Sequence, residues 1–380
     1  MDIALYRRGF NQVEEFIEYS DKKLRTRFQD VPSLRDLVTV LTQCLRVVWI
    51  PLDAAKDDHQ AIFESLNDKG MRLSASELIC SFLFHPLSDV PDFESLHNMK
   101  WLQAMRQFPK KDQFEEYLRY LFSVGERKMV GKDRKIYVHF KARNRPLTAS
   151  SARSRLDEIF DNTRLYQNVI DPIEHPHADH RVTGLLMSIC DTRMDSCTPF
   201  LLGLLRGVRD GYVKLDEARG LLNKTLTMLV RRKMTERPTT VYDTMFPPLF
   251  GRIMDARSKL RALQDVFREN DVMVTDDEFL DALVYRPLYR SRDIDFARMV
   301  LTEIDLTMQI DGQLPDYSTI NTVEHVIPQR LDSDWEIYLG EDAHSSDFDR
   351  VINSLGNLCL MSQVGNSRVG RNPFEKKVNE

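Results

Sequence analysis

Four residues near the C-terminal end of the chain have the types and spacing of a chemical site. Glu324 and His325 adjoin in a short apolar stretch, Asn357 opens a second stretch, and Asn366 follows nine residues later at the start of an expected helix. A lone histidine in an apolar stretch is more often a core residue than a catalyst, but His325 has a carboxylate beside it and two later amides. Because an imidazole has an ordinary pKa of about 6.5, His325 can accept a proton near neutral pH. The set therefore predicts acid–base chemistry.

The elements that must position these residues differ from the rest of the chain. After Pro315 the helical rhythm gives way to two short apolar stretches, 323–327 and 358–361, separated by an acidic, turn-rich segment. This pattern predicts a small mixed β and α unit. Adjacent strand residues point to opposite faces, so we expect a bend at the hairpin to bring Glu324 and His325 to one site.

From about residue 10 to residue 305 the apolar spacing predicts helices. One strand candidate, Arg46–Leu52, is rich in β-branched and aromatic residues and precedes a predicted helix near Ala61–Leu66. Ser74 or Ser76 is expected to cap the next helix, with Glu77 placed three residues after Ser74 for a capping box. Leucines of the middle region are expected to pack in the core; they are Leu201, Leu202, Leu204 and Leu205.

The composition excludes several classes of protein. With 380 residues, 42% of them hydrophobic, the chain can bury the cores of two or three domains, and disorder is not expected as its main state. Its apolar runs are far shorter than the roughly 20 residues of a membrane span. No secretory signal is evident at the N-terminus, so the cytoplasm is the expected compartment. Five widely spaced cysteines indicate free thiols, and the net charge of −5 gives no global attraction to nucleic acid.

Two local basic segments leave a nucleic-acid contact open. Residues 127–145 carry eight basic side chains against one acidic, with Tyr137 and Phe140 among them. This segment is either a solvated helix face or a phosphate-contacting surface. Arg231 and Arg232 follow an apolar helix and are a second candidate for phosphate contact.

Two other signals are weaker. The segment 125–132 looks like a phosphate-binding loop, but five residues separate its glycines and Asp133 stands where Ser or Thr would hold magnesium. We reject that reading. The segment His175–His180 offers three imidazoles and a carboxylate, which fits either a metal clip or, more often, a polar loop rich in proline.

The C-terminal segments resemble the HNH, or ββα-metal, nuclease motif, in which an acid–His pair precedes Ile-x-Pro and two later asparagines complete the site. More closely, they are similar to the C-terminal domain of GmrSD-type, modification-dependent restriction endonucleases. Glu-His-Val-Ile-Pro-Gln at 324–329, Leu-Gly-Asn-Leu-Cys-Leu at 355–360 and the segment 366–377 carry this resemblance. Two upstream segments, 62–74 and 229–233, are similar to further landmarks of the family in the same order.

The resemblance implies a role for each residue of the candidate site. Phosphodiester hydrolysis needs a deprotonated water, a cation beside the phosphate, and help for the leaving 3′ oxygen. His325 would be the general base, and Glu324 and Asn366 would supply oxygens to Mg²⁺ or Mn²⁺. Asn357 would orient the loop that bears His325 through hydrogen bonds.

The resemblance also implies partners and a missing part. DNA, modified or from phage, is the expected substrate, and Lys376 and Lys377 would meet its phosphates unless they simply face solvent. The family has a ParB/sulfiredoxin-like domain whose earlier half carries nucleotide-binding motifs, Tyr-Gln-Arg and Asp-Gly-Gln-Gln-Arg. Neither stands in this sequence, so we expect a missing N-terminal nucleotide-binding segment or subunit.

Together these observations predict a mainly α protein in three parts. Residues 1–86 would be the helical C-terminal part of the ParB/sulfiredoxin-like domain, 87–310 a helical middle domain, and 311–380 an HNH ββα-metal nuclease unit. The predicted function is metal-dependent DNA cleavage in restriction. The alternative is a non-catalytic remnant of such a system that binds DNA or assembles with a partner.

Overall fold

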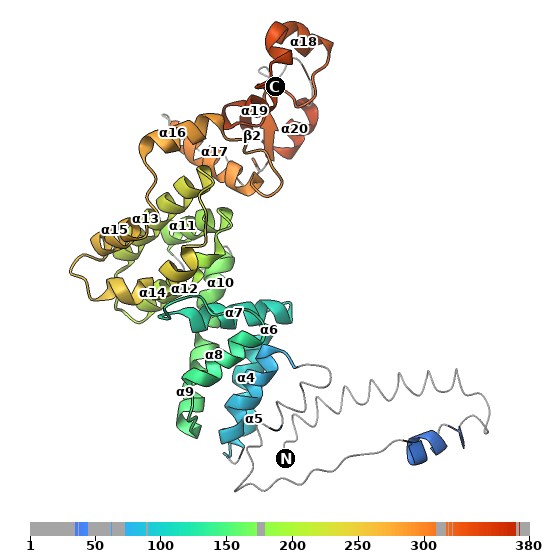
Figure 1. The fold of residues 1–380 in the computed structure, drawn as a ribbon, viewed down its shortest axis with the longest axis vertical. Coiled ribbons are helices and arrows are strands. Elements are labelled where there is room, and N and C mark those ends of the chain that lie inside the picture. Colours follow the sequence, from blue (N-terminus) through green and yellow to red (C-terminus); the bar gives the residue numbers. More distant parts are fainter. Residues whose placement is uncertain are drawn as a thin grey trace. The chain divides into compact units, whose positions relative to one another are not determined.

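The computed structural model describes residues 35–36, 38–44, 62, 73–88, 90–172, 179–308, 317, 319–320, 322–369 and 372. Over these residues the protein is mainly α, with one two-stranded sheet near the C-terminus, which confirms the predicted fold class (Figure 1). The predicted strand 46–52 lies outside the described residues, as does the helix near 61–66 except for residue 62. None of the described helices is long and apolar enough to cross a membrane.

Two compact units make up the chain. Unit 1 comprises residues 1–119 and 131–163, and unit 2 comprises residues 120–130 and 164–380. The boundaries of these units differ from the boundaries of the three predicted domains, at residues 86 and 310. The three-domain division remains a prediction from the sequence.

Unit 1 is built from helices, and its helix α4 begins at the predicted cap. The backbone N–H of Glu77 donates to Ser74 Oγ over 3.4 Å, and the N–H of Ser74 donates to Glu77 Oε2 over 2.9 Å. This capping box satisfies donors that the first turn of a helix leaves unpaired. From residue 73 on, the α-helices described in this unit are α4 (Ala75–Phe84), α5 (Phe93–Leu96), α6 (Leu102–Arg106), α7 (Lys111–Ser123, whose last turn belongs to unit 2), α8 (Arg134–Arg143) and α9 (Ala149–Asp161).

Helix α8 carries the aromatic residues of the basic segment 127–145 into the core of unit 1. Tyr137 and Phe140 are 1% and 2% exposed. Both meet Phe82 of α4 edge to face, with ring centroids 6.3 and 6.2 Å apart. These two rings therefore stabilise the fold and are not available to stack on bases.

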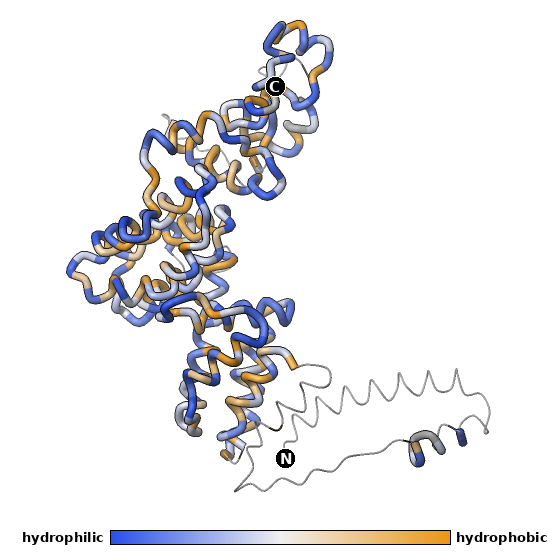
Figure 2. Tube along the Cα trace, in the orientation of Figure 1, coloured by the Kyte–Doolittle hydropathy of each residue, from blue (hydrophilic) through white to orange (hydrophobic). Residues whose placement is uncertain are grey.

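Unit 2 contains a helical body around an apolar core. Leu201 and Leu204 are buried in this core and the partly buried Leu205 packs against it, while Leu202 is also fully buried, which confirms the predicted packing. Helix α12 passes α14 so closely that a Cβ at Gly203 would lie 2.9 Å from Phe250 Cγ. Figure 2 shows apolar and polar residues alternating along these helices, as amphipathic helices require. They are α10 (Thr163–Ile170), α11 (His180–Asp191), α12 (Thr198–Arg209), α13 (Leu215–Met234), α14 (Tyr242–Met254) and α15 (Lys259–Glu269).

The C-terminal part of unit 2 holds the sheet. Strand β1 (Thr322–His325) pairs antiparallel with β2 (Leu358–Met361), and His325 lies opposite Leu358. Both strands lie in the predicted apolar stretches, 323–327 and 358–361. The first strand ends at His325, so Val326 and Ile327 of the predicted stretch are not part of it. The accompanying helices are α16 (Asp276–Tyr285), α17 (Ile294–Met308), α18 (Ser333–Leu339), α19 (Phe348–Ile352) and α20 (Gln363–Val369).

A hairpin of two short strands is marginal by itself, and here it packs against α17. Val323 and Leu358 share one apolar core with Phe296 of α17 and Leu288 of the preceding loop. Figure 1 shows α17 beside β2, in agreement with the contacts between these elements. Residues 311–380 therefore depend on helices that precede them in the chain.

Candidate active site

His325 ends strand β1 and is enclosed by groups from two other segments. Its side chain lies on the buried face of the strand with Val323, and the residue is 5% exposed. The ring of Tyr289 meets the imidazole edge to face, with centroids 4.1 Å apart. On another side, His325 Nε2 lies 3.2 Å from Asn353 Oδ1. The sequence predicted His325 as the central residue but gave no indication of these neighbours.

Asn353 follows helix α19 and connects three parts of the site. Its Oδ1 accepts a hydrogen bond from Gln329 Nε2 over 2.9 Å. The same oxygen is the atom that contacts His325 Nε2. Its main-chain oxygen accepts from the N–H groups of Leu288 and Tyr289, over 2.7 and 3.2 Å. In the sequence, the available signal for Asn353 was its position four residues before Asn357. Its residue type alone does not reveal that it contacts His325.

The Asn357 side chain makes three hydrogen bonds to the main chain of two other segments. Its Oδ1 accepts from the Ile327 N–H over 2.8 Å, and its Nδ2 donates to the Ile327 oxygen over 2.9 Å and to the Ile352 oxygen over 2.8 Å. The main-chain oxygen of Asn357 also accepts from the N–H of Val326 over 2.9 Å. Asn357 is 5% exposed, so these bonds form away from bulk water. They fix the backbone immediately after His325.

Glu324 lies on the other face of β1 from His325, as strand alternation demands. It is half-buried, and its main-chain oxygen lies 3.7 Å from the Cys359 sulfur across the hairpin. Asn366 lies on helix α20, which contacts β1. Burial alternates along Thr322–His325, so Glu324 and His325 lie on opposite faces within this strand.

The hard oxygen donors for a cation are therefore few. Among the described residues, no group of three or more His, Cys, Asp or Glu side chains gathers in a way that could hold a metal ion. A site of one carboxylate and one amide falls below that number. Mg²⁺ keeps several waters and takes substrate phosphate as a ligand, so two protein oxygens are compatible with it.

The basic residues predicted to contact phosphates are not brought to His325 by any described contact. Lys376 and Lys377 lie outside the described residues. Arg231 of α13 pairs with Asp276 over 2.6 Å and its guanidinium lies 5.1 Å from the Phe279 ring centre.

Arg232 is 5% exposed and belongs to the interior of unit 2. Its Nε donates to the hydroxyl of Tyr242 over 3.0 Å, and its terminal nitrogens donate to the main-chain oxygens of Asp271 and Pro238. A buried guanidinium needs such partners, and together they favour a structural role for Arg232 over contact with phosphate.

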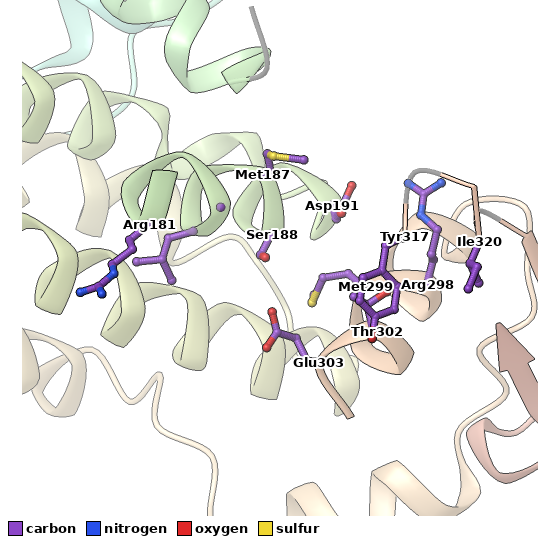
Figure 3. A pocket seen from close by; sticks show the side chains of 12 residues that line it. Arg181, Met187, Ser188, Asp191, Arg298, Met299, Thr302, Glu303, Tyr317 and Ile320 are labelled. Atoms are coloured by element: carbon purple, nitrogen blue, oxygen red, sulfur yellow. The ribbon is translucent and has the colours of Figure 1, made fainter. Parts of the chain in front are cut away.

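Two further places in unit 2 carry polar or charged side chains: the segment 175–180 and a pocket between α11 and α17. Of the segment 175–180, residues 175–178 lie outside the described residues, while Asp179 caps α11 by accepting from the N–H of Arg181 over 2.9 Å. A pocket of about 600 Å³ lies between α11 and α17. Side chains of both charges line it, among them Asp191 and Arg298 (Figure 3). Burial raises the pKa of Asp191, and the nearby Arg298 opposes this. The residues that line the pocket do not include His325 or its neighbours.

Comparison with known proteins supports the C-terminal assignment. Residues 273–380 match the family of GmrSD restriction endonucleases, C-terminal domain. The match begins before α16 and so includes α16, α17, the hairpin and α20. No curated protein matches the chain. Over residues 273–380 the chain is therefore similar to the C-terminal domain of GmrSD restriction endonucleases, as the sequence resemblance indicated.

Proposed function

We propose that this protein is a metal-dependent DNA endonuclease in which His325 is the general base of an HNH-type hydrolysis. The observation that carries the proposal is the placement of His325 at the end of β1, against Asn353 and Tyr289, in a GmrSD C-terminal domain. DNA, modified or from phage, is the proposed substrate.

The contact between His325 and Asn353 supports this role through the tautomer it selects. An amide Oδ1 only accepts hydrogen bonds, so His325 Nε2 must carry the hydrogen in this contact. The neutral imidazole then has its basic lone pair on Nδ1. Nδ1 is the atom that we propose removes the proton from the attacking water.

The surrounding hydrogen bonds hold this base in place. Asn357 fixes residues 326 and 327 on one side of His325, and Asn353 fixes its Nε2 on the other. A base within reach of its proton is effective only when its geometry is preorganised. Asn353 and Asn357 are therefore positioning residues in this proposal.

The metal site of the proposal consists of the Glu324 carboxylate and the Asn366 amide. Both are oxygen donors of the kind that Mg²⁺ or Mn²⁺ prefers, and the helix and strand that carry them are in contact. A cation held by these two oxygens would supply positive charge beside the phosphate and the leaving 3′ oxygen. Lys376, Lys377 and Arg231 remain proposed contacts to DNA phosphates.

Removal of divalent cations tests the metal requirement. We expect excess EDTA to reduce cleavage of supercoiled DNA to the level without protein, and added Mg²⁺ or Mn²⁺ to restore it, because the phosphate charge would lack its counter-ion. Circular dichroism with and without EDTA serves as the folding control. Cleavage at an unchanged rate in EDTA would contradict the proposed metal dependence.

Replacement of Asn353 tests the proposed positioning of His325. We expect Asn353→Ala to lower the single-turnover cleavage rate by about 10- to 100-fold, the effect found when a hydrogen-bond partner that orients a metal-ligating histidine is removed, with little change in DNA affinity. Selective ¹⁵N-histidine NMR should show His325 losing its single Nε2–H tautomer, which a purely structural role would not change.

Gln329→Ala is the matched control, because it removes the other donor to Asn353 Oδ1 and leaves His325 in contact with that oxygen. We expect it to cleave at close to the wild-type rate. Equal rates and equal His325 spectra in the two variants would show that Asn353 does not position the base.

A further inference from the structure

The loop between α16 and α17 is joined to the candidate active site by main-chain contacts. Pro287 forms an isolated β-bridge with Ser354, and Leu288 and Tyr289 donate to the main-chain oxygen of Asn353. Leu288 is fully buried in the core beneath the sheet. One residue, Asn353, thus fixes the loop through its backbone and contacts His325 through its side chain.

Buried ion pairs anchor both ends of this loop. Asp293 is almost completely buried and pairs with Lys233 over 3.1 Å and with Arg286 over 3.2 Å. Arg286, at the start of the loop, is itself buried and also donates to the main-chain oxygen of Lys233. These contacts connect both ends of the loop, residues 286 and 293, to Lys233 of helix α13.

Two other arginines of the loop are accessible. The side chains of Arg290 and Arg292 are 40% and 72% exposed. Arg290 immediately follows Tyr289, so its Cα lies about 3.8 Å along the chain from the residue whose ring contacts His325. Arg290 and Arg292 are therefore the exposed cations of a loop whose neighbouring residue forms one wall of the site.

The carboxylates in this cluster do not balance its cations. Glu236 is the shared partner of Arg286, Arg290 and Arg292, over 3.6, 3.3 and 3.8 Å. Among the described residues, the printed ion pairs of these three arginines and of Lys233 involve the carboxylates of Glu236 and Asp293, which leaves two positive charges in this group of six side chains. The pKa of Arg286 is lowered by its burial and by the like charges of Arg290 and Arg292, in spite of both carboxylates. An anion at the exposed side would relieve this excess.

We infer that Arg290 and Arg292 form a phosphate-binding edge that holds the backbone of substrate DNA beside His325. One guanidinium group can donate two parallel hydrogen bonds to two oxygens of a phosphate, and it stays charged at all relevant pH values. Backbone contacts of this kind position a duplex without reading its sequence. The inference rests on the proposed function, since it assigns these residues to the same substrate.

The test measures DNA binding apart from cleavage. In the full chain carrying His325→Ala, the affinity for a short fluorescent duplex is measured by anisotropy over a series of salt concentrations. Each lost phosphate contact lowers the slope of log affinity against log salt by about 0.9, which corresponds to roughly eight-fold in affinity at 0.1 M salt. We expect Arg290→Gln with Arg292→Gln to lower the slope by about 2 and the affinity by roughly 60-fold at 0.1 M salt.

Two control variants separate charge from folding. Arg290→Lys with Arg292→Lys keeps both charges and should retain most of the slope. Arg268→Gln removes an exposed arginine of α15 that pairs with Asp265, and should leave binding unchanged. Equal thermal midpoints for all variants establish that the fold is intact.

The outcomes distinguish this inference from the proposed function. An unchanged slope and affinity in the double Gln variant, with DNA bound by the parent protein, would overturn the phosphate-binding edge and leave the nuclease proposal standing. Failure of the parent protein to bind any duplex would overturn both.

Discussion

His325→Ala is expected to slow DNA cleavage by roughly 10²–10⁴-fold, the usual cost of removing a general base. The alanine has no group that accepts the proton of the attacking water, whereas the hairpin and the Asn357 hydrogen bonds stay in place. The measurement is the single-turnover rate of nicking of supercoiled DNA, with DNA binding recorded in parallel. Binding should be retained, because the variant removes no proposed phosphate contact.

The matched control for this variant is His344→Ala. His344 is an exposed histidine of the same C-terminal domain, at the end of the 3₁₀ turn Gly340–His344. Its replacement should leave the cleavage rate within the error of the wild type. If His325→Ala, folded and with wild-type DNA affinity, cleaved as fast as His344→Ala, then His325 would not be the base.

Asp293→Asn is expected to destabilise the protein by about 3–5 kcal/mol, the usual result of breaking a buried ion pair from one side. The substitution keeps the shape of the side chain but leaves Lys233 and Arg286 buried with less negative charge. The free energy of unfolding can be measured by urea denaturation followed by circular dichroism. Since this cluster anchors the loop that carries Tyr289, cleavage should also fall at temperatures where the variant is still folded.

Asp295→Asn is the comparison for that experiment. Asp295 lies two residues away on α17 and pairs with Arg193 and, over 3.5 Å, with Arg298 at the surface. Partly exposed ion pairs contribute about 0–1 kcal/mol, so this variant should stay close to the wild type. A loss for Asp293→Asn that did not exceed the loss for Asp295→Asn would show that the buried cluster does not hold the loop.

Local sequence signals predicted the elements well where short-range physics decides them. The Ser74 cap, the leucines of α12 and the two apolar stretches that pair as β1 and β2 depend on spacing of a few residues. Capping chemistry and apolar periodicity act over that range, so one sequence is enough to read them.

The surroundings of His325 depend instead on contacts between distant segments. Asn353 is 28 residues from His325 in the chain, and Tyr289 comes from a loop before α17. For Arg232 too, contacts with distant segments were not evident from the sequence, and here they remove a predicted phosphate contact rather than add a neighbour to the site. A basic cluster normally indicates a solvated surface, but tertiary partners such as Tyr242 bury this guanidinium.

The most direct test of the central claim is a cleavage assay on unmodified and phage-modified supercoiled DNA, with the wild-type chain in Mg²⁺ or Mn²⁺. The account predicts nicked or linear product that requires the cation and His325, on at least one of the two substrates. Absence of product on both substrates, from folded protein with the cation present, would contradict the claim that this chain is itself a nuclease.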